Sequence, residues 1–260
     1  MQETGDGIAY FEVLNGMGPG GVMKPIIGFN VDVAIEDAGP TVTRMNIRYT
    51  DLILQHGGIP VIFPPGVSPE DVEGMVDGFL LIGGDDYRCG IPEGESDPER
   101  FVEVLPRRES ADLEWARWLV NSDLPVLGIC GGLQILCLAA GGSIYGDLES
   151  ETGTEIKHRV IEKGILPVHA IDWQGELSGC PDSGSFEVNS SHHQSVKDLP
   201  QGWRLLGVTE DGIVEACCDA EGRCVGVQWH PELIPDEPLS QSIVRRLIAK
   251  ASVRQGERFA

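Results

Sequence analysis

The chain has 260 residues, and its 19 lysines and arginines against 41 aspartates and glutamates give a formal net charge of −22 at pH 7. A protein this acidic is repelled by phosphate backbones and anionic lipid, which argues against nucleic-acid or membrane partners. No apolar run approaches the ~20 residues that span a bilayer, and the first residues lack the basic and apolar regions of a signal peptide, so we expect a cytoplasmic globular protein.

Strand and helix signals alternate along the first half of the chain. In chain order, the predicted elements are a strand at 25–30, a helix at 43–56, a strand at 59–63, a helix at 68–76, a strand at 79–84, a helix at 109–120 and a strand at 125–129. Apolar residues at helical spacing mark the first helix, and Ser68 followed by Pro69 marks the start of the second. This alternation predicts a parallel sheet with helices on both faces.

After about residue 142 the pattern changes to short segments rich in β-branched or aromatic residues. These segments lie at 154–162, 166–173, 185–196, 203–209, 212–218 and 224–230. Because turn signals separate them, we expect antiparallel additions to the sheet. A helix at 240–250 closes the chain.

We expect one catalytic domain over residues 23–252, with a flexible extension at 1–22 before it and a short tail at 253–260 after it. The extension is acidic and rich in glycine. A second irregular stretch, the acidic, proline- and glycine-rich loop at 89–108, follows the strand at 79–84, where α/β sheets carry binding loops.

The strand at 125–129 ends at Cys130, within the sequence GICGG. This is the thiol form of the nucleophile elbow, a tight strand-to-helix turn that lifts the side chain above the sheet and needs small neighbours. The helix that follows points its N-terminus at the sulfur and favours the thiolate, and the N–H of Gly131 faces the position of a tetrahedral oxyanion. On this motif alone, a buried structural cysteine is the alternative.

A thiol nucleophile needs a base, and the base needs a group that orients it. His230 ends an apolar run, and Glu232 follows two residues later. In an extended chain these two side chains point to the same side, so the carboxylate can reach the far ring nitrogen. A histidine with only a structural role is the alternative here.

The seven cysteines have no regular spacing. Cys217, Cys218 and Cys224 lack a paired CxxC motif, so we expect no metal site among them and interpret the other thiols as small buried hydrophobes in a reducing compartment.

With these motifs in place, the chain resembles the class I glutamine amidotransferases, and among them the free-standing gamma-glutamyl hydrolases of the gamma-glutamyl-gamma-aminobutyrate hydrolase type. The matching segments occur in family order over about residues 24–250. They are 25–30, 55–65, 77–86, 108–113, 125–148, 188–196, 211–216 and 225–232. The pairing of GICxGxQ with a distant QWHPE is highly specific.

The resemblance implies a flavodoxin-like class I glutamine amidotransferase fold and a role for each matching residue. Cys130 is the nucleophile, His230 the general base and acid, and Glu232 its orienting carboxylate. Gly84, from the glycine pair at 83–84, joins Gly131 in the oxyanion hole. Gln134 and His192 contact the substrate. The expected partner is a small gamma-glutamyl compound, with no metal and no organic cofactor.

The sequence also departs from this family. The hydrolase branch commonly has arginine after the nucleophile, where this chain has Gly131, and the segment after the glycine pair differs as well. The identity of the released amine therefore stays open. Arg108 matches a family arginine, with a solvated salt bridge at the start of a helix as the alternative.

Three other functions stay open. They are a glutaminase subunit that delivers ammonia to a synthase, an α/β-hydrolase with a cysteine nucleophile, and a non-catalytic binding module on the same fold. In an α/β-hydrolase the acid precedes the histidine in the chain, whereas here it follows. The oligomeric state is also open, a homodimer included.

Overall fold

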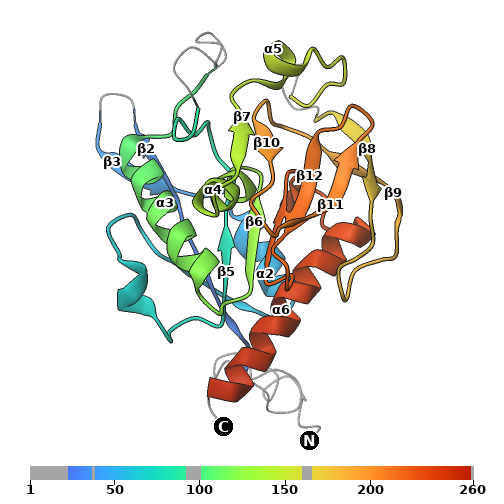
Figure 1. Ribbon diagram of the computed structural model, residues 1–260. Helices are drawn as coiled ribbons and strands as arrows, with labels where there is room; N and C mark the ends of the chain where they lie inside the picture. The colour runs from blue at the N-terminus through green and yellow to red at the C-terminus, as the bar shows by residue number, and fades with distance from the viewer. Residues whose placement is uncertain (1–22, 37–38, 92–100, 160–165, 259–260) are drawn as a thin grey trace, which may run out of the picture.

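The computed structural model describes residues 23–36, 39–91, 101–159 and 166–258. The expected extension at 1–22 lies outside these residues, as does the 92–100 part of the loop expected at 89–108. A nine-stranded sheet forms the centre of the molecule, with helices packed on its faces (Figure 1).

One half of the central sheet is parallel. Its strands, in spatial order, are β4 (Ile59–Ile62), β1 (Ile26–Phe29), β5 (Gly78–Leu81), β6 (Val126–Ile129) and β13 (Cys224–Val227). Every neighbouring pair in this half is parallel. Ranked along the chain, the order is 2-1-3-4-5, which is the flavodoxin-like order. The predicted fold class is confirmed.

The other half of the sheet is antiparallel. Its strands continue from β13 in the order β12 (Val214–Cys218), β11 (Arg204–Thr209), β8 (Val168–Trp173) and β9 (Gly184–Asn189). The expected additions are thus present, with two differences. β10 (Ser195–Asp198) pairs with β7 (Ser143–Tyr145) in a separate small sheet, and the described part of the strand expected at 154–162 contains no regular strand.

Two helices cover each face of the sheet. α2 (Arg48–Gln55) and α6 (Pro238–Arg258) bury apolar residues in one core cluster, and α3 (Pro106–Asn121) and α4 (Gly131–Ala139) do so in the other. α5 (Leu148–Thr152) is short. None of the helices within the described residues combines the length and apolar character that a membrane crossing requires.

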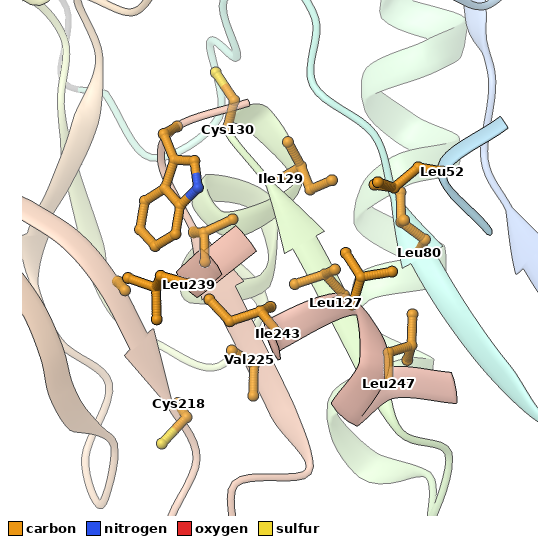
Figure 2. Close-up of a cluster of buried hydrophobic side chains, with 14 of the residues drawn as sticks. Leu52, Leu80, Leu127, Ile129, Cys130, Cys218, Val225, Leu239, Ile243 and Leu247 are labelled. Carbon is orange, nitrogen blue, oxygen red and sulfur yellow. The ribbon is translucent and has the colours of Figure 1, made fainter. Parts of the chain in front are cut away.

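The close-up in Figure 2 shows how the first core cluster supports the end of a central strand. Leu127 and Ile129 of β6 face Ile243 and other apolar residues of α6, and Cys130 lies at the end of the same strand. Since α6 runs as far as Arg258, the helix expected at 240–250 is longer than predicted and includes residues 253–258 of the expected tail.

Two of the predicted helices are wrong in part. Residues at the start of the helix expected at 43–56 belong to a hairpin of β2 (Asp32–Ile35) and β3 (Thr41–Arg44). The helix expected at 68–76 is a single 3-10 turn, η1 (Pro69–Val72). Gly74 has a φ of 77°, a left-handed conformation that cannot continue a right-handed helix.

Candidate active site

Three neighbouring parallel strands, β5, β6 and β13, end at the same edge of the sheet. Gly83, Cys130 and His230 follow these three ends and line one cavity of about 560 Å³. This edge is where α/β sheets bind ligands. The residues that the sequence predicts to act together therefore lie close together at the expected edge of the sheet.

The turn at Cys130 is strained. Its φ of 51° and ψ of −111° make it the only non-glycine residue with positive φ among those described. Glycines make the turn feasible: a Cβ on Gly128 would lie 2.6 Å from the Gly132 carbonyl carbon, and a Cβ on Gly132 would lie 2.2 Å from the Leu81 oxygen. Strain of this kind persists only where the surrounding structure enforces it, and it is typical of active sites.

His230 and Glu232 form a close pair. His230 Nδ1 lies 2.7 Å from Glu232 Oε1, and only 2% of the Glu232 side chain is exposed. A carboxylate only accepts, so Nδ1 donates and Nε2 is the nitrogen left for the thiol. Burial alone would lower the pKa of His230, but the negative charges of Glu232 and Cys130 outweigh it and raise that pKa well above its usual value.

Two residues that the sequence did not single out also hold the nucleophile and the base. Asn189, at the end of β9, accepts from the His230 backbone N–H at 2.8 Å and donates to its carbonyl at 3.0 Å. Gln228 donates from Nε2 to Cys130 Sγ at 3.4 Å. Asn189 lies in the segment 188–196 and Gln228 in the segment 225–232, both of which carry the family resemblance. A polar side chain next to the end of a strand is the sequence signal that could have identified them.

The geometry around the glycine pair favours Gly84 as an oxyanion donor. The Gly83 N–H already donates to the Tyr49 hydroxyl at 3.2 Å. A Cβ on Gly131 would lie 3.4 Å from the Gly84 nitrogen, so the two backbone donors expected for the oxyanion lie close together. Such paired N–H groups stabilise the negative oxygen of a tetrahedral intermediate.

Arg108 fixes the direction of the Gly84 N–H. Its Nη2 donates to the Gly83 carbonyl oxygen at 2.8 Å. In a trans peptide the carbonyl and the following N–H point in opposite directions, and the described chain contains no cis bond. The Gly84 N–H therefore points away from Arg108, toward the side on which Gly131 lies.

A solvated role for Arg108 is wrong, because its side chain is fully buried. Nε lies 3.0 Å from Asp112 Oδ2, and Nη1 lies 2.7 Å from Asp32 Oδ1. Burial alone would lower the pKa of Arg108, but neighbouring charges, including those of both carboxylates, raise it above its usual value. The guanidinium is therefore a permanent cation beneath the glycine pair.

Replacing Arg108 with lysine is expected to lower kcat by about 10- to 100-fold with a smaller change in KM, because an ammonium cannot hold the carbonyl and both carboxylates at once. The free energy of unfolding should fall by about 1–3 kcal/mol. Steady-state kinetics and chemical denaturation measure the two effects. Arg107→Lys is the matched control, since Arg107 lies on the same helix and contacts Pro65 instead. Equal losses in both variants would contradict a role in positioning.

The two predicted substrate contacts differ in the structure. Gln134 borders the cavity, and its Nε2 donates to the Gln194 carbonyl at 3.0 Å and to Gln228 Oε1 at 3.3 Å. The ring of His192 is only 1% exposed, with Nδ1 3.1 Å from the Gln194 carbonyl and Nε2 3.2 Å from Glu215 Oε1. Its ring nitrogens therefore face protein, while the residue borders the cavity, and its contact with the substrate stays a prediction.

Known proteins match both the sequence and the fold. A family model described as Peptidase C26 matches residues 25–232. A "putative glutamine amidotransferase" of Schizosaccharomyces pombe is 30% identical over 73% of this chain and 75% of its own length. Gamma-glutamyl-gamma-aminobutyrate hydrolase PuuD of Escherichia coli K12 is 28% identical over 75% of this chain and 80% of its own length.

One solved structure supports the fold alone. A glutamine amidotransferase from Thermotoga maritima superposes with a TM-score of 0.52 at 16% identity, covering 89% of this chain and 97% of that one. Together with the sequence relatives, the cavity supports a hydrolase or amidotransferase-like enzyme.

Proposed function

Since the chain belongs to the peptidase C26 family, we propose that it is a cysteine hydrolase that cleaves the gamma-glutamyl amide bond of a small compound and releases glutamate and an amine. The observation that carries this proposal is the strained Cys130 in one cavity with the His230–Glu232 pair. A structural cysteine has no need of a strained backbone or of a buried, oriented imidazole beside it.

In the first half of the reaction, the Cys130 thiolate attacks the side-chain δ-carbonyl of the gamma-glutamyl amide. A carbon–sulfur bond forms, and the carbonyl oxygen becomes an oxyanion that accepts from the N–H groups of Gly84 and Gly131. The intermediate then expels the amine, which takes a proton from His230 Nε2, and a thioester remains on Cys130.

In the second half, His230 removes a proton from water, and the resulting hydroxide attacks the thioester carbonyl. The carbon–sulfur bond breaks, glutamate leaves and the Cys130 thiolate is restored. Throughout, Glu232 holds the imidazole in one orientation and stabilises its protonated form, a role that the 2.7 Å contact supports.

The cavity wall suits a polar, zwitterionic glutamyl group. Because both Nε2 hydrogens of Gln134 are donated within the protein, its Oε1 is the atom that would accept from the substrate. Arg44 and Asp85 border the same cavity with opposite charges, 61% and 50% of their side chains being exposed. They would meet the α-carboxylate and the α-ammonium group.

A glutaminase that supplies ammonia to a synthase is the second candidate, since a relative bears the name of a glutamine amidotransferase. A glutaminase would follow the same steps as far as the thioester. It differs in the leaving group, which is ammonia, and in the delivery of that ammonia to a synthase.

Glutamate release from a panel of gamma-glutamyl amides tests the proposal, with glutamine and gamma-glutamyl-gamma-aminobutyrate included. We expect at least one small gamma-glutamyl amide to have a kcat/KM at least about tenfold above that of glutamine, because the amine half adds contacts in the cavity. Hydrolysis of glutamine alone, strongly stimulated by a synthase, would favour the second candidate. Absence of glutamate release from every compound would rule out both.

A further inference from the structure

A second polar cluster lies in the interior, outside the hydrolytic groups. Three imidazoles surround the carboxylate of Glu215, a fully buried residue of β12. Glu215 Oε1 lies 3.2 Å from His169 Nε2, 3.2 Å from His192 Nε2 and 3.6 Å from His158 Nδ1. Each of the three histidine side chains is less than a tenth exposed.

Two of these rings present a lone pair to the centre of the cluster. His158 Nε2 lies 3.0 Å from Asp211 Oδ2, and His192 Nδ1 lies 3.1 Å from the Gln194 carbonyl oxygen. Both partners can only accept, so each contact fixes the ring hydrogen on the outer nitrogen. In the neutral imidazole, the inner nitrogen then turns its lone pair toward the negative oxygen of Glu215.

Such an arrangement is unfavourable unless a cation lies within it or a ring carries a second proton. Among the residues that the structure describes, neither oxygen of Glu215 and neither ring nitrogen of His169 has a hydrogen-bond partner, and all four atoms are buried. Leaving a buried polar atom unsatisfied costs about 1–3 kcal/mol, and more for a charged group. A cation among the inner nitrogens and the carboxylate would remove both the repulsion and the unsatisfied groups.

We propose that this cluster binds a divalent transition-metal ion of the zinc class, with His158, His169 and Glu215 as ligands and His192 as the fourth. The candidate ligand atoms of the first three lie within 4.8 Å of one another. Zinc–nitrogen and zinc–oxygen bonds of about 2.0–2.2 Å in a tetrahedron place ligand atoms roughly 3.3 Å apart, which agrees with the distances around Oε1.

The outer contacts of the rings also fit a metal site. Histidines that bind metals nearly always donate their second ring N–H to a carboxylate or a backbone carbonyl, which fixes the tautomer and the ring orientation. Asp211 does this for His158, and the Gln194 carbonyl does so for His192. Three nitrogens and one carboxylate are ligands that zinc accepts.

A metal here would be structural. The site is closed, and it ties strands β8 and β12 to two loops that also contact each other, since the His192 backbone N–H donates to the His158 carbonyl at 2.8 Å. The Glu215 carbonyl accepts from the Gln228 backbone N–H at 2.7 Å, and the Gln228 side chain donates to Cys130 Sγ. The metal would thus stabilise the wall of the hydrolytic cavity while taking no part in catalysis.

Metal analysis of the full chain in the Cys130→Ala background tests the proposal, because that background keeps zinc from binding at the Cys130–His230 pair. We expect zinc in a one-to-one ratio after removal by chelator and titration back, and a rise in Tm as zinc is added. Cobalt(II) at the same site should give the visible absorption of a tetrahedral ion.

His169→Gln is the sharpest variant, because His169 forms no hydrogen bond that the change would remove. We expect it, and Glu215→Gln, to bind zinc at least about 10-fold more weakly and to lose the rise in Tm. His56→Gln is the matched control, since that ring contacts only the Leu52 carbonyl at the end of α2 and should leave zinc binding unchanged.

Two results would overturn the proposal. One is a parent chain whose Tm and metal content do not respond to zinc, which would leave a cluster of protonated imidazoles around Glu215. The other is equal zinc binding by His169→Gln and by the parent, which would place the metal on surface groups or thiols. If Glu215→Gln fails to fold, the comparison of the parent with His169→Gln still decides.

Discussion

Replacing Cys130 with alanine is expected to lower glutamate release by about 10³-fold or more. In the proposed mechanism the thiolate forms the only covalent bond to the substrate, so its loss leaves just the oxyanion donors and substrate binding. Stopped assays with the best gamma-glutamyl amide measure the effect. Cys137→Ala is the matched control, because Cys137 is a buried thiol on α4 that packs in an apolar cluster and donates to the Ser143 and Asp198 carbonyls.

Covalent labelling separates loss of chemistry from loss of fold. We expect 6-diazo-5-oxonorleucine, a gamma-glutamyl-directed electrophile, to add one equivalent to the parent chain and to Cys137→Ala, and none to Cys130→Ala. The alanine variant should keep its Tm within a few degrees, since the new side chain is smaller and fits the same turn. Failure of the parent chain to be labelled would favour a non-catalytic binding module.

The substitution Glu232→Gln is expected to lower kcat by about 10²- to 10⁴-fold and to change its pH dependence. The charge of Glu232 is one of the groups that raise the pKa of His230, so an uncharged amide should let that pKa fall. His230 must carry a proton to release the amine, and the fraction that does so declines as pH rises through its pKa. The basic limb of the kcat profile should therefore shift to lower pH.

Asp236→Asn is the control for this experiment, because it removes the same charge from an exposed residue four positions further along the chain. Its profile should match that of the parent. A basic limb that stays in place in Glu232→Gln would show that Glu232 does not act on His230. Full activity of that variant would revive the α/β-hydrolase alternative, in which another acid orients the histidine.

The parts of the site that the sequence predicted depend on neighbours in the chain. The elbow at Cys130 needs glycines two residues away on either side, and His230 with Glu232 needs only an extended pair at i and i+2. The parallel strands were predicted because each is a short apolar run between turn signals. Such patterns survive folding because tertiary contacts reinforce them.

The parts that the sequence missed depend on contacts between distant segments. The sequence did not predict the β2–β3 hairpin, because β3 overlaps a segment whose apolar residues have helical spacing. Pairing with β2 makes these residues a strand. The direction of the His192 ring follows from Glu215, which is distant in the chain. The same holds for Arg108, whose three partners come from two other segments and one turn of its own helix.

The order of the strands separates reactivity from selectivity in this protein. The proposed nucleophile, oxyanion donor and base follow three adjacent central strands, so their mutual distances are set by the spacing of about 4.8 Å between hydrogen-bonded strands. Of the two side chains proposed to meet the rest of the substrate, Arg44 comes instead from a peripheral hairpin strand, β3. Substitution in that hairpin can therefore change how the glutamyl group is held while the geometry of bond cleavage is inherited unchanged.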